Sequence, residues 1–331
     1  MIPSFFSKDK FAVFSTISLD FPSAVYYDFH RKQSGGRNDL KRFFALILAC
    51  LLLCSAAAAE TKVTMYAKDG RTLEVPLSQV EAHKKVNWFT SKEEVTTRMR
   101  AKDGRILTVW KAEVPAYIKV NWIPMQDDTL DPRKPMVALT YDDGPNPYST
   151  PKILDTLEFY NAKATFFVLG NLASRYPALV QRTASTGCLV GNHSWSHPNL
   201  PTLKEQDMLP QITWTDNEIR KATGSIASVM RPPYGNHNDK LRELCQKPLI
   251  LWNMDTLDWK YRSSSRVANT VLSGVKDGDI VLMHDIYSTT AQATETIVPE
   301  LLKRGFQLVT VEELAKYRGV TLEKGKTYTD F

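Results

Sequence analysis

From Pro135 onward, short apolar segments typical of buried strands alternate with longer segments typical of helices. This alternation constrains the fold more than any other feature, because strands separated by helices form β-α-β units around a parallel sheet. At this length the natural closure is a (β/α) barrel, whose active site is expected at the carboxyl ends of the strands. The expected strands are 137–140, 164–169, 249–253 and 280–283, and the expected helices are 151–160, 177–186, 266–274 and 294–305.

Residues 60–128 contain a tandem duplication with a period of 34 residues. The segment 67–71 (AKDGR) recurs at 101–105, and 85–88 (KVNW) recurs at 119–122. Alternating residues on both sides of Asp-Gly predict a β-hairpin in each copy, which excludes a tetratricopeptide fold. We therefore expect two small β-rich modules. Trp88 and Trp122 are either platforms for sugars or the cores of the modules, and we favour the core interpretation.

An apolar run at 43–59 follows Lys41 and Arg42 and ends in small residues, which is the pattern of a secretory signal peptide at 40–59. An uncleaved signal anchor is the alternative. Signal peptides normally begin at the initiator, so residues 1–39 are interpreted as an N-terminal extension from a mis-assigned start. The rest of the chain is expected to be exported and to act in the periplasm, in the cell wall or outside the cell. Cys188 and Cys245, which remain after signal removal, form either a disulfide or two buried thiols.

The net charge of +6 hints at an anionic partner until its location is considered. Seven of the 42 Lys and Arg residues and four of the 36 Asp and Glu residues lie in residues 1–59. Residues 60–331 therefore carry 35 positive and 32 negative charges. This near balance removes the support for nucleic-acid binding, and contact with a membrane is expected only through the leader.

Two segments at strand ends carry residues suited to a metal. Asp142 and Asp143 follow the first strand, and their mutual repulsion can be relieved by a cation, although a plain turn fits the segment too. His193 and His197, at i and i+4, would project to one side of a helical turn. One Asp and two His leave coordination positions open, as in catalytic metal sites. The same ligands occur in iron oxygenases, but neither the spacing nor the α/β pattern fits those enzymes.

Three further segments follow at other strand ends. Arg231-Pro232-Pro233 forms a rigid loop whose arginine can anchor a carboxylate, or a structural turn with a surface arginine. The segment 252–259 carries Asp258 and Trp259. The segment 280–285 is a buried strand ending in His284, and a single terminal histidine is more often structural. Five such segments at successive strand ends favour a shared catalytic site.

The five segments, in this order, resemble the five motifs of the polysaccharide deacetylases, the NodB homology domain of carbohydrate esterase family four. The resemblance implies a distorted (β/α) barrel and metal-dependent hydrolysis of N-acetyl or O-acetyl groups on sugars. It implies a catalytic domain at 129–319 and a tail at 320–331. The roles that it implies are a general base (Asp142), metal ligands, usually for Zn²⁺ (Asp143, His193, His197), an arginine that holds the base (Arg231), an oxyanion donor (the Tyr234 N–H), a general acid with its tuning carboxylate (His284, Asp258) and walls of the acetyl pocket (Trp259, Leu282).

The expected function is an exported enzyme that deacetylates N-acetylglucosamine in a cell-wall polymer, with peptidoglycan as the favoured substrate. Tyr234 in the third motif resembles the N-acetylglucosamine enzymes more than the muramic-acid enzymes, in which a second arginine is common. Chitooligosaccharides, exopolysaccharide and acetylxylan are alternative substrates. A wall-binding protein with an inactive barrel is the alternative of another class, and the intact ligands and acid/base residues argue against it.

Overall fold

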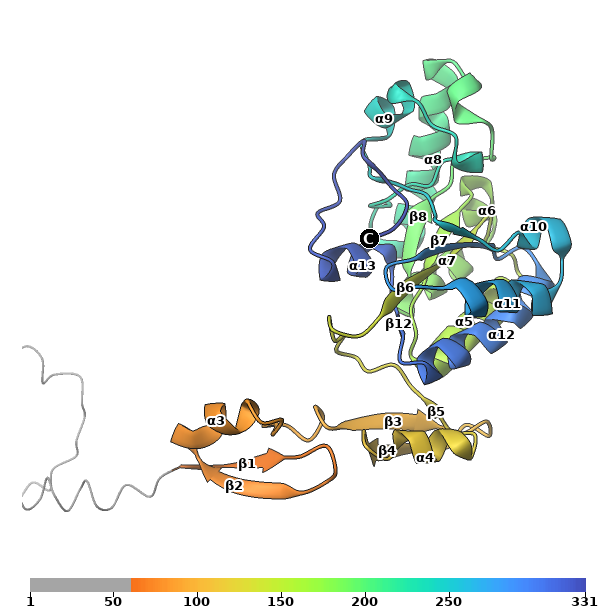
Figure 1. Cartoon of the computed structure of the whole chain (residues 1–331). Helices are drawn as coiled ribbons and strands as arrows, with labels where there is room; N and C mark the ends of the chain where they lie inside the picture. Colours follow the sequence, from red (N-terminus) through yellow and green to blue (C-terminus); the bar gives the residue numbers. More distant parts are fainter. Residues whose placement is uncertain (1–60) are drawn as a thin grey trace, which may run out of the picture. The chain divides into compact units, whose positions relative to one another are not determined.

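The computed structural model describes residues 61–331, and the extension and the expected leader lie outside the described residues (Figure 1). None of the helices in 61–331 has the length and hydropathy needed to cross a membrane. The expected signal peptide or anchor at 40–59 stays a prediction, as does its cleavage.

Each 34-residue repeat forms a hairpin followed by a short helix. In the first, the hairpin of β1 and β2 is joined by Asp69-Gly70, and Gly70 has the positive φ (90°) that the turn requires. Trp88 is half-buried and packs against Met65, Val75 and Val80, which favours the core interpretation of this tryptophan. The elements are β1 (Lys62–Tyr66), β2 (Thr72–Pro76), a 3₁₀ turn (Leu77–Gln79), α3 (Val80–Lys84), β3 (Thr96–Arg100), β4 (Ile106–Trp110), α4 (Val114–Lys119) and β5 (Ile123–Pro124).

The parallel sheet of the C-terminal part confirms the barrel prediction. The strand order is β10-β11-β6-β7-β8, and β12 pairs with the start of β6. Single bridges through Met230 link β8 to β9. β9 and β10 are consecutive along the chain, so a short connection joins the two ends of the strand order. The strands are β6 (Met136–Asp142), β7 (Thr165–Val168), β8 (Leu189–Asn192), β9 (Leu249–Ile250), β10 (Met254–Asp255), β11 (Ile280–His284) and β12 (Gln307–Leu308).

Helices cover the outside of the sheet (Figure 1). The expected helices are all present, but two begin two or more residues earlier than predicted: α11 at Ser264 and α12 at Ser288. Ser263 caps α11 by accepting a hydrogen bond from Arg266 N–H, which explains the earlier start. The helices are α5 (Thr150–Tyr160), α6 (Gly170–Arg175), α7 (Pro177–Ser185), α8 (Glu205–Thr223), α9 (Asp239–Cys245), α10 (Asp258–Tyr261), α11 (Ser264–Gly274), α12 (Ser288–Lys303) and α13 (Val311–Tyr317), with 3₁₀ turns at Leu200–Thr202 and Pro233–Gly235.

The alternation of side chains along β6 separates two cores. Val137, Leu139 and Tyr141 pack in the large cluster beneath α5, α11 and α12. Met136 and Ala138 belong to a second cluster inside the barrel. Because side chains alternate with a period of two, Asp142 at the end of β6 points to the interior side.

Residues just beyond both ends of the expected catalytic domain (129–319) belong to the same fold as that domain. The Gln126 side chain hydrogen-bonds both backbone groups of Leu308. Residues 320–331, expected as a tail, contain β13 (Thr327–Tyr328), which pairs in parallel with β9. Cys188 and Cys245 are both free and buried, so the disulfide alternative is not realised.

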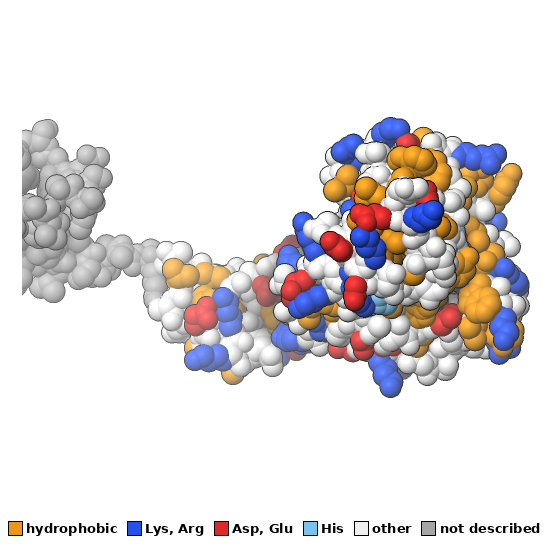
Figure 2. All heavy atoms as spheres, turned by 90° about the horizontal axis from the view of Figure 1, so that it is seen from above, with side chains coloured by type: hydrophobic (Ala, Val, Ile, Leu, Met, Phe, Trp, Pro, Cys, Tyr) orange, Lys and Arg blue, Asp and Glu red, His pale blue; other side chains and the backbone are white. Residues whose placement is uncertain are grey.

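Charged side chains of both signs are interspersed on the face shown in Figure 2. This distribution agrees with the near balance of charge counted in residues 60–331.

Candidate active site

Asp142 is buried and held in place by an arginine inside the barrel. Arg231 has no exposed surface, and its Nη1 donates to Asp142 Oδ1 (2.8 Å) and to Thr140 Oγ1 (2.7 Å). Its Nε and Nη2 donate to the carbonyls of Ile250 (2.9 Å) and Leu251 (2.7 Å). The guanidinium therefore fixes one carboxylate oxygen of Asp142, and Oδ2 lies 3.8 Å from His193 Nε2.

Asp143, His193 and His197 form a cluster suited to a metal ion. Nε2 of His193 and Nε2 of His197 each lie 3.4 Å from Asp143 Oδ1. The Arg231 carbonyl accepts a hydrogen bond from His193 Nδ1 (2.7 Å), which leaves Nε2 as the ring's lone-pair donor. Burial raises the pKa of Asp143, but the neighbouring imidazoles of His193 and His197 outweigh it and lower the pKa to about 2.

The chemistry of these donors fits a divalent cation. Asp143 Oδ1 is buried without a hydrogen-bond partner among the described residues, and it faces the Nε2 atoms of two histidines. A cation between them would pair with the ionised carboxylate and accept the Nε2 lone pairs of both imidazoles.

The histidine pair does not lie on a helical turn, and that expectation is wrong. Between β8 and the 3₁₀ turn at Leu200 the chain forms a loop in which Ser194 (φ 70°) and His197 (φ 62°) are left-handed. A right-handed helix excludes such φ values. The Ser194 hydroxyl accepts a hydrogen bond from the His197 N–H (3.1 Å), and this bend returns the second imidazole to Asp143.

His284 ends β11 directly opposite Asp142 in the strand register. Its Nδ1 donates to Asp258 Oδ1 (2.7 Å), while Asp258 Oδ2 accepts from the His284 N–H and from the Thr290 hydroxyl. Burial lowers the pKa of His284, but the hydrogen bond and charge of Asp258 outweigh it and raise the pKa to about 9. The imidazole is therefore protonated at neutral pH and able to donate a proton.

Asp142, the three metal-ligand candidates and His284 all line one cavity of about 400 Å³. Tyr234, Trp259 and Leu282 line it as expected, and Leu282 is buried whereas Tyr234 and Trp259 are exposed. Tyr234 has a left-handed backbone (φ 61°), which is unusual for a bulky residue and typical of functional sites. Of the ten residues predicted from the sequence, eight line the cavity, and Arg231 and Asp258 lie behind it.

The comparison with known proteins agrees with this geometry. A family model described as polysaccharide deacetylase matches residues 129–248. A peptidoglycan-N-acetylglucosamine deacetylase of Bacillus cereus is 37% identical over 188 residues, which are 55% of this chain and 68% of the relative. The chain belongs to the polysaccharide deacetylase family. The resemblance stated from the five motifs is thereby confirmed.

Two other similar proteins act on peptidoglycan according to their names. The peptidoglycan-N-acetylglucosamine deacetylase PgdA of Listeria monocytogenes is 45% identical over 194 residues, 59% of this chain. That match covers only 41% of the Listeria protein, so the chain spans less than half of it. The solved structure of peptidoglycan deacetylase PdaC from Bacillus subtilis has a TM-score of 0.57 at 43% identity, covering 57% of this chain and 94% of that one.

Several residues of the site were not singled out by the sequence. Trp252 and Tyr287 line the cavity. Trp252 begins the fourth motif but was given no role, and Tyr287 lies three residues after His284. Thr290, which supports Asp258, lies on α12 and has no local signal. Asp285, next to His284, is buried, and burial raises its pKa to about 7. Its Oδ2 accepts a hydrogen bond from the Thr150 hydroxyl at the start of α5.

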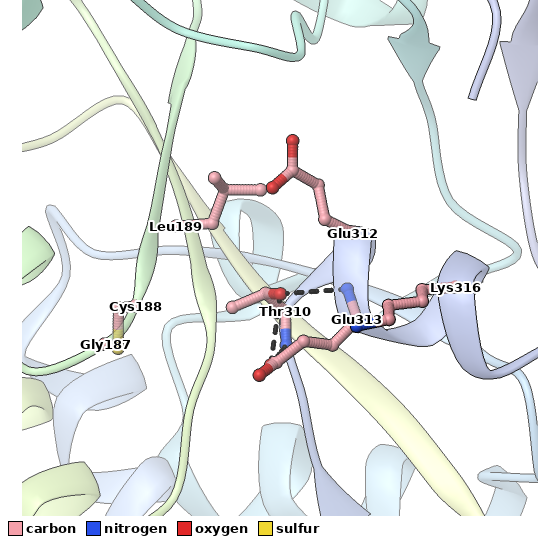
Figure 3. Close-up of a pocket in the computed structure, with 7 residues that line it drawn as sticks. All are labelled: Gly187, Cys188, Leu189, Thr310, Glu312, Glu313 and Lys316. Carbon is pink, nitrogen blue, oxygen red and sulfur yellow. Dashed lines mark hydrogen bonds between the residues drawn. The ribbon is translucent and has the colours of Figure 1, made fainter. Parts of the chain in front are cut away.

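A second hollow, of about 320 Å³, lies between the start of β8 and α13 (Figure 3). A capping box begins α13: the Thr310 hydroxyl accepts a hydrogen bond from the Glu313 N–H, and the Glu313 carboxylate accepts one from the Thr310 N–H. Burial raises the pKa of the Cys188 thiol, which makes it less reactive. This hollow has the features of a helix cap and not of a reactive site.

Proposed function

We propose that the protein is a metal-dependent deacetylase that hydrolyses the N-acetyl group of N-acetylglucosamine in peptidoglycan and releases acetate. The observation that carries the proposal is the convergence in one cavity of a fixed carboxylate (Asp142), a metal-ligand cluster and a histidine hydrogen-bonded to a buried carboxylate (His284). Amide hydrolysis needs a base for the water, stabilisation of the developing oxyanion and an acid for the amine. The cavity offers a group for each.

Asp143, His193 and His197 would hold the metal, and we propose Zn²⁺ because two imidazoles and one carboxylate with open positions are typical of catalytic zinc. Bound there, the ion supplies Lewis acidity and lowers the pKa of water.

The protein's own residues complete the reaction. Asp142, held by Arg231, takes a proton from the attacking water as the new C–O bond forms. The Tyr234 N–H donates to the carbonyl oxygen as it becomes negative, an effect of about 3–4 kcal/mol for one well-placed donor. His284 then gives its Nε2 proton to the leaving nitrogen as the C–N bond breaks. Trp259 and Leu282 surround the methyl group of the acetyl.

The names of the relatives and the cavity support a peptidoglycan substrate and therefore an exported enzyme. The Bacillus cereus and Listeria relatives are named for N-acetylglucosamine, whereas the curated PdaC of Bacillus subtilis, 43% identical over 193 residues, is named for N-acetylmuramic acid. Tyr234 in the third motif favours N-acetylglucosamine in this chain. Chitooligosaccharides, exopolysaccharide and acetylxylan remain the alternatives to be compared.

The test is acetate release from peptidoglycan and from each alternative polymer, with identification of the deacetylated sugar by mass spectrometry. Asp142→Asn should abolish release, whereas Asp239→Asn, a change at a 99% exposed side chain, should leave it intact. The absence of metal-dependent acetate release from every polymer would support the alternative of a wall-binding protein.

A further inference from the structure

Arg262 has no acidic partner among residues 61–331, and it packs on the ring of Tyr287, which lines the catalytic cavity. Tyr287 lines the cavity, with its ring 5.8 Å from that of His284. The Arg262 guanidinium carbon lies 3.2 Å from the centroid of the Tyr287 ring. The Arg262 side chain is exposed, and no ion pair or side-chain hydrogen bond within residues 61–331 engages it.

The local backbone and the stacking fix this guanidinium. Arg262 ends α10 in a left-handed conformation (φ 48°), which L residues rarely adopt. Its N–H donates to the carbonyl of Asp258, the residue that positions His284. A guanidinium placed over a ring keeps N–H groups free for bidentate contact with a carboxylate, and the contact with the ring restricts the side chain before binding.

The position of Arg262 indicates which part of a substrate it meets. Arg262 does not line the cavity that would take the acetamide group. With the acetamide group in the cavity, Arg262 would meet what is attached beside the reacting sugar. In peptidoglycan the neighbouring sugar carries a lactyl group and a peptide with free carboxylates, whereas chitooligosaccharides carry no charge.

We propose that Arg262, stacked on Tyr287, binds a carboxylate of the glycan next to the acetylated sugar and so makes the enzyme selective for carboxylated over neutral substrates. This inference rests on the proposed function and names a specificity-determining residue for it. Arg266 supplies the matched control, because its guanidinium carbon lies 3.4 Å from the Tyr261 ring, which does not line the cavity.

The experiment measures kcat/KM of wild type, Arg262→Ala, Arg262→Lys and Arg266→Ala on a carboxylate-bearing peptidoglycan oligosaccharide and on the N-acetylglucosamine tetramer. The ratio of the two values should fall about tenfold in Arg262→Ala, through KM, as expected for loss of one charge-assisted hydrogen-bonded contact. Arg262→Lys should lose part of the selectivity, and Arg266→Ala should keep it. In wild type the ratio should fall as salt is raised, and in Arg262→Ala it should not.

A ratio that is unchanged in Arg262→Ala, or that falls equally in Arg266→Ala, overturns the proposal. The Kd of the same oligosaccharide for Asp142→Asn, with and without Arg262→Ala, separates this inference from the function on which it rests. If wild type releases no acetate from either substrate, the deacetylase function fails. The binding measurement still tests the carboxylate site: a Kd about tenfold higher for Asp142→Asn/Arg262→Ala than for Asp142→Asn would support it, and an equal Kd would overturn it.

Discussion

Replacement of Arg231 by lysine keeps the positive charge but removes the shape that the site requires. The guanidinium donates from three nitrogens to four acceptors: Asp142, Thr140 and the carbonyls of Ile250 and Leu251. A lysine carries all its donors on one atom and cannot reach the carboxylate and both carbonyls together.

The cost follows from the acceptors left without a donor. The buried Ile250 carbonyl loses its partner at a cost of about 1–3 kcal/mol, and the part-buried Leu251 carbonyl loses its partner at a smaller cost. Arg231→Lys should therefore lower the free energy of unfolding by about 2–4 kcal/mol. A whole domain is stable by only about 5–15 kcal/mol, so the effect is large. Asp142 also loses its fixed position, and a displacement of about 1 Å from the reactive geometry lowers kcat/KM about 100-fold.

The assay is urea unfolding followed by fluorescence, together with kcat/KM at a temperature where both proteins are folded. Arg242→Lys is the matched control, because Arg242 forms a single surface ion pair with Asp239 and should change stability by less than about 0.5 kcal/mol. A loss below about 1 kcal/mol in Arg231→Lys with unchanged kcat/KM would refute the reasoning.

Three other predictions concern the acid, the first loop and the metal. His284 acts when protonated, and Asp258→Asn removes the charge that raises its pKa to about 9. The variant should therefore move the alkaline limb of the kcat/KM profile toward about pH 6.5, and at pH 8 the protonated fraction of His284 would fall from about 0.9 to about 0.03. An alkaline limb that does not move would contradict this. Gly144→Ala would bring a Cβ within 2.1 Å of the buried Asp285 carboxylate, so a lower Tm and reduced activity are expected, and a wild-type Tm would count against this packing. His193→Ala should reduce the bound divalent metal per chain in elemental analysis, and wild-type stoichiometry would exclude this histidine as a ligand.

The sequence predicted the ends of three expected strands to within two residues, because strand periodicity is local. The expected strand 249–253 is instead divided into β9 (Leu249–Ile250) and β10 (Met254–Asp255). Asp142, His193 and His284 follow apolar segments, and parallel strands bring those ends to one edge of the barrel. The prediction that His193 and His197 lie on a helical turn was wrong, because the i, i+4 spacing alone does not distinguish a helical turn from a bend with left-handed residues. The earlier start of α12 at Ser288 was also missed.

The sequence by itself determined the α/β alternation, the family motifs and the residue types of the ligand cluster, since these depend on near neighbours in the chain. Only the tertiary structure decided the contacts between distant segments. It buried Arg231 between Thr140 and Ile250, paired residues 327–328 with β9, and stacked Arg262 on Tyr287. The physical reason is that such contacts depend on how the barrel closes, which the local periodicity does not specify.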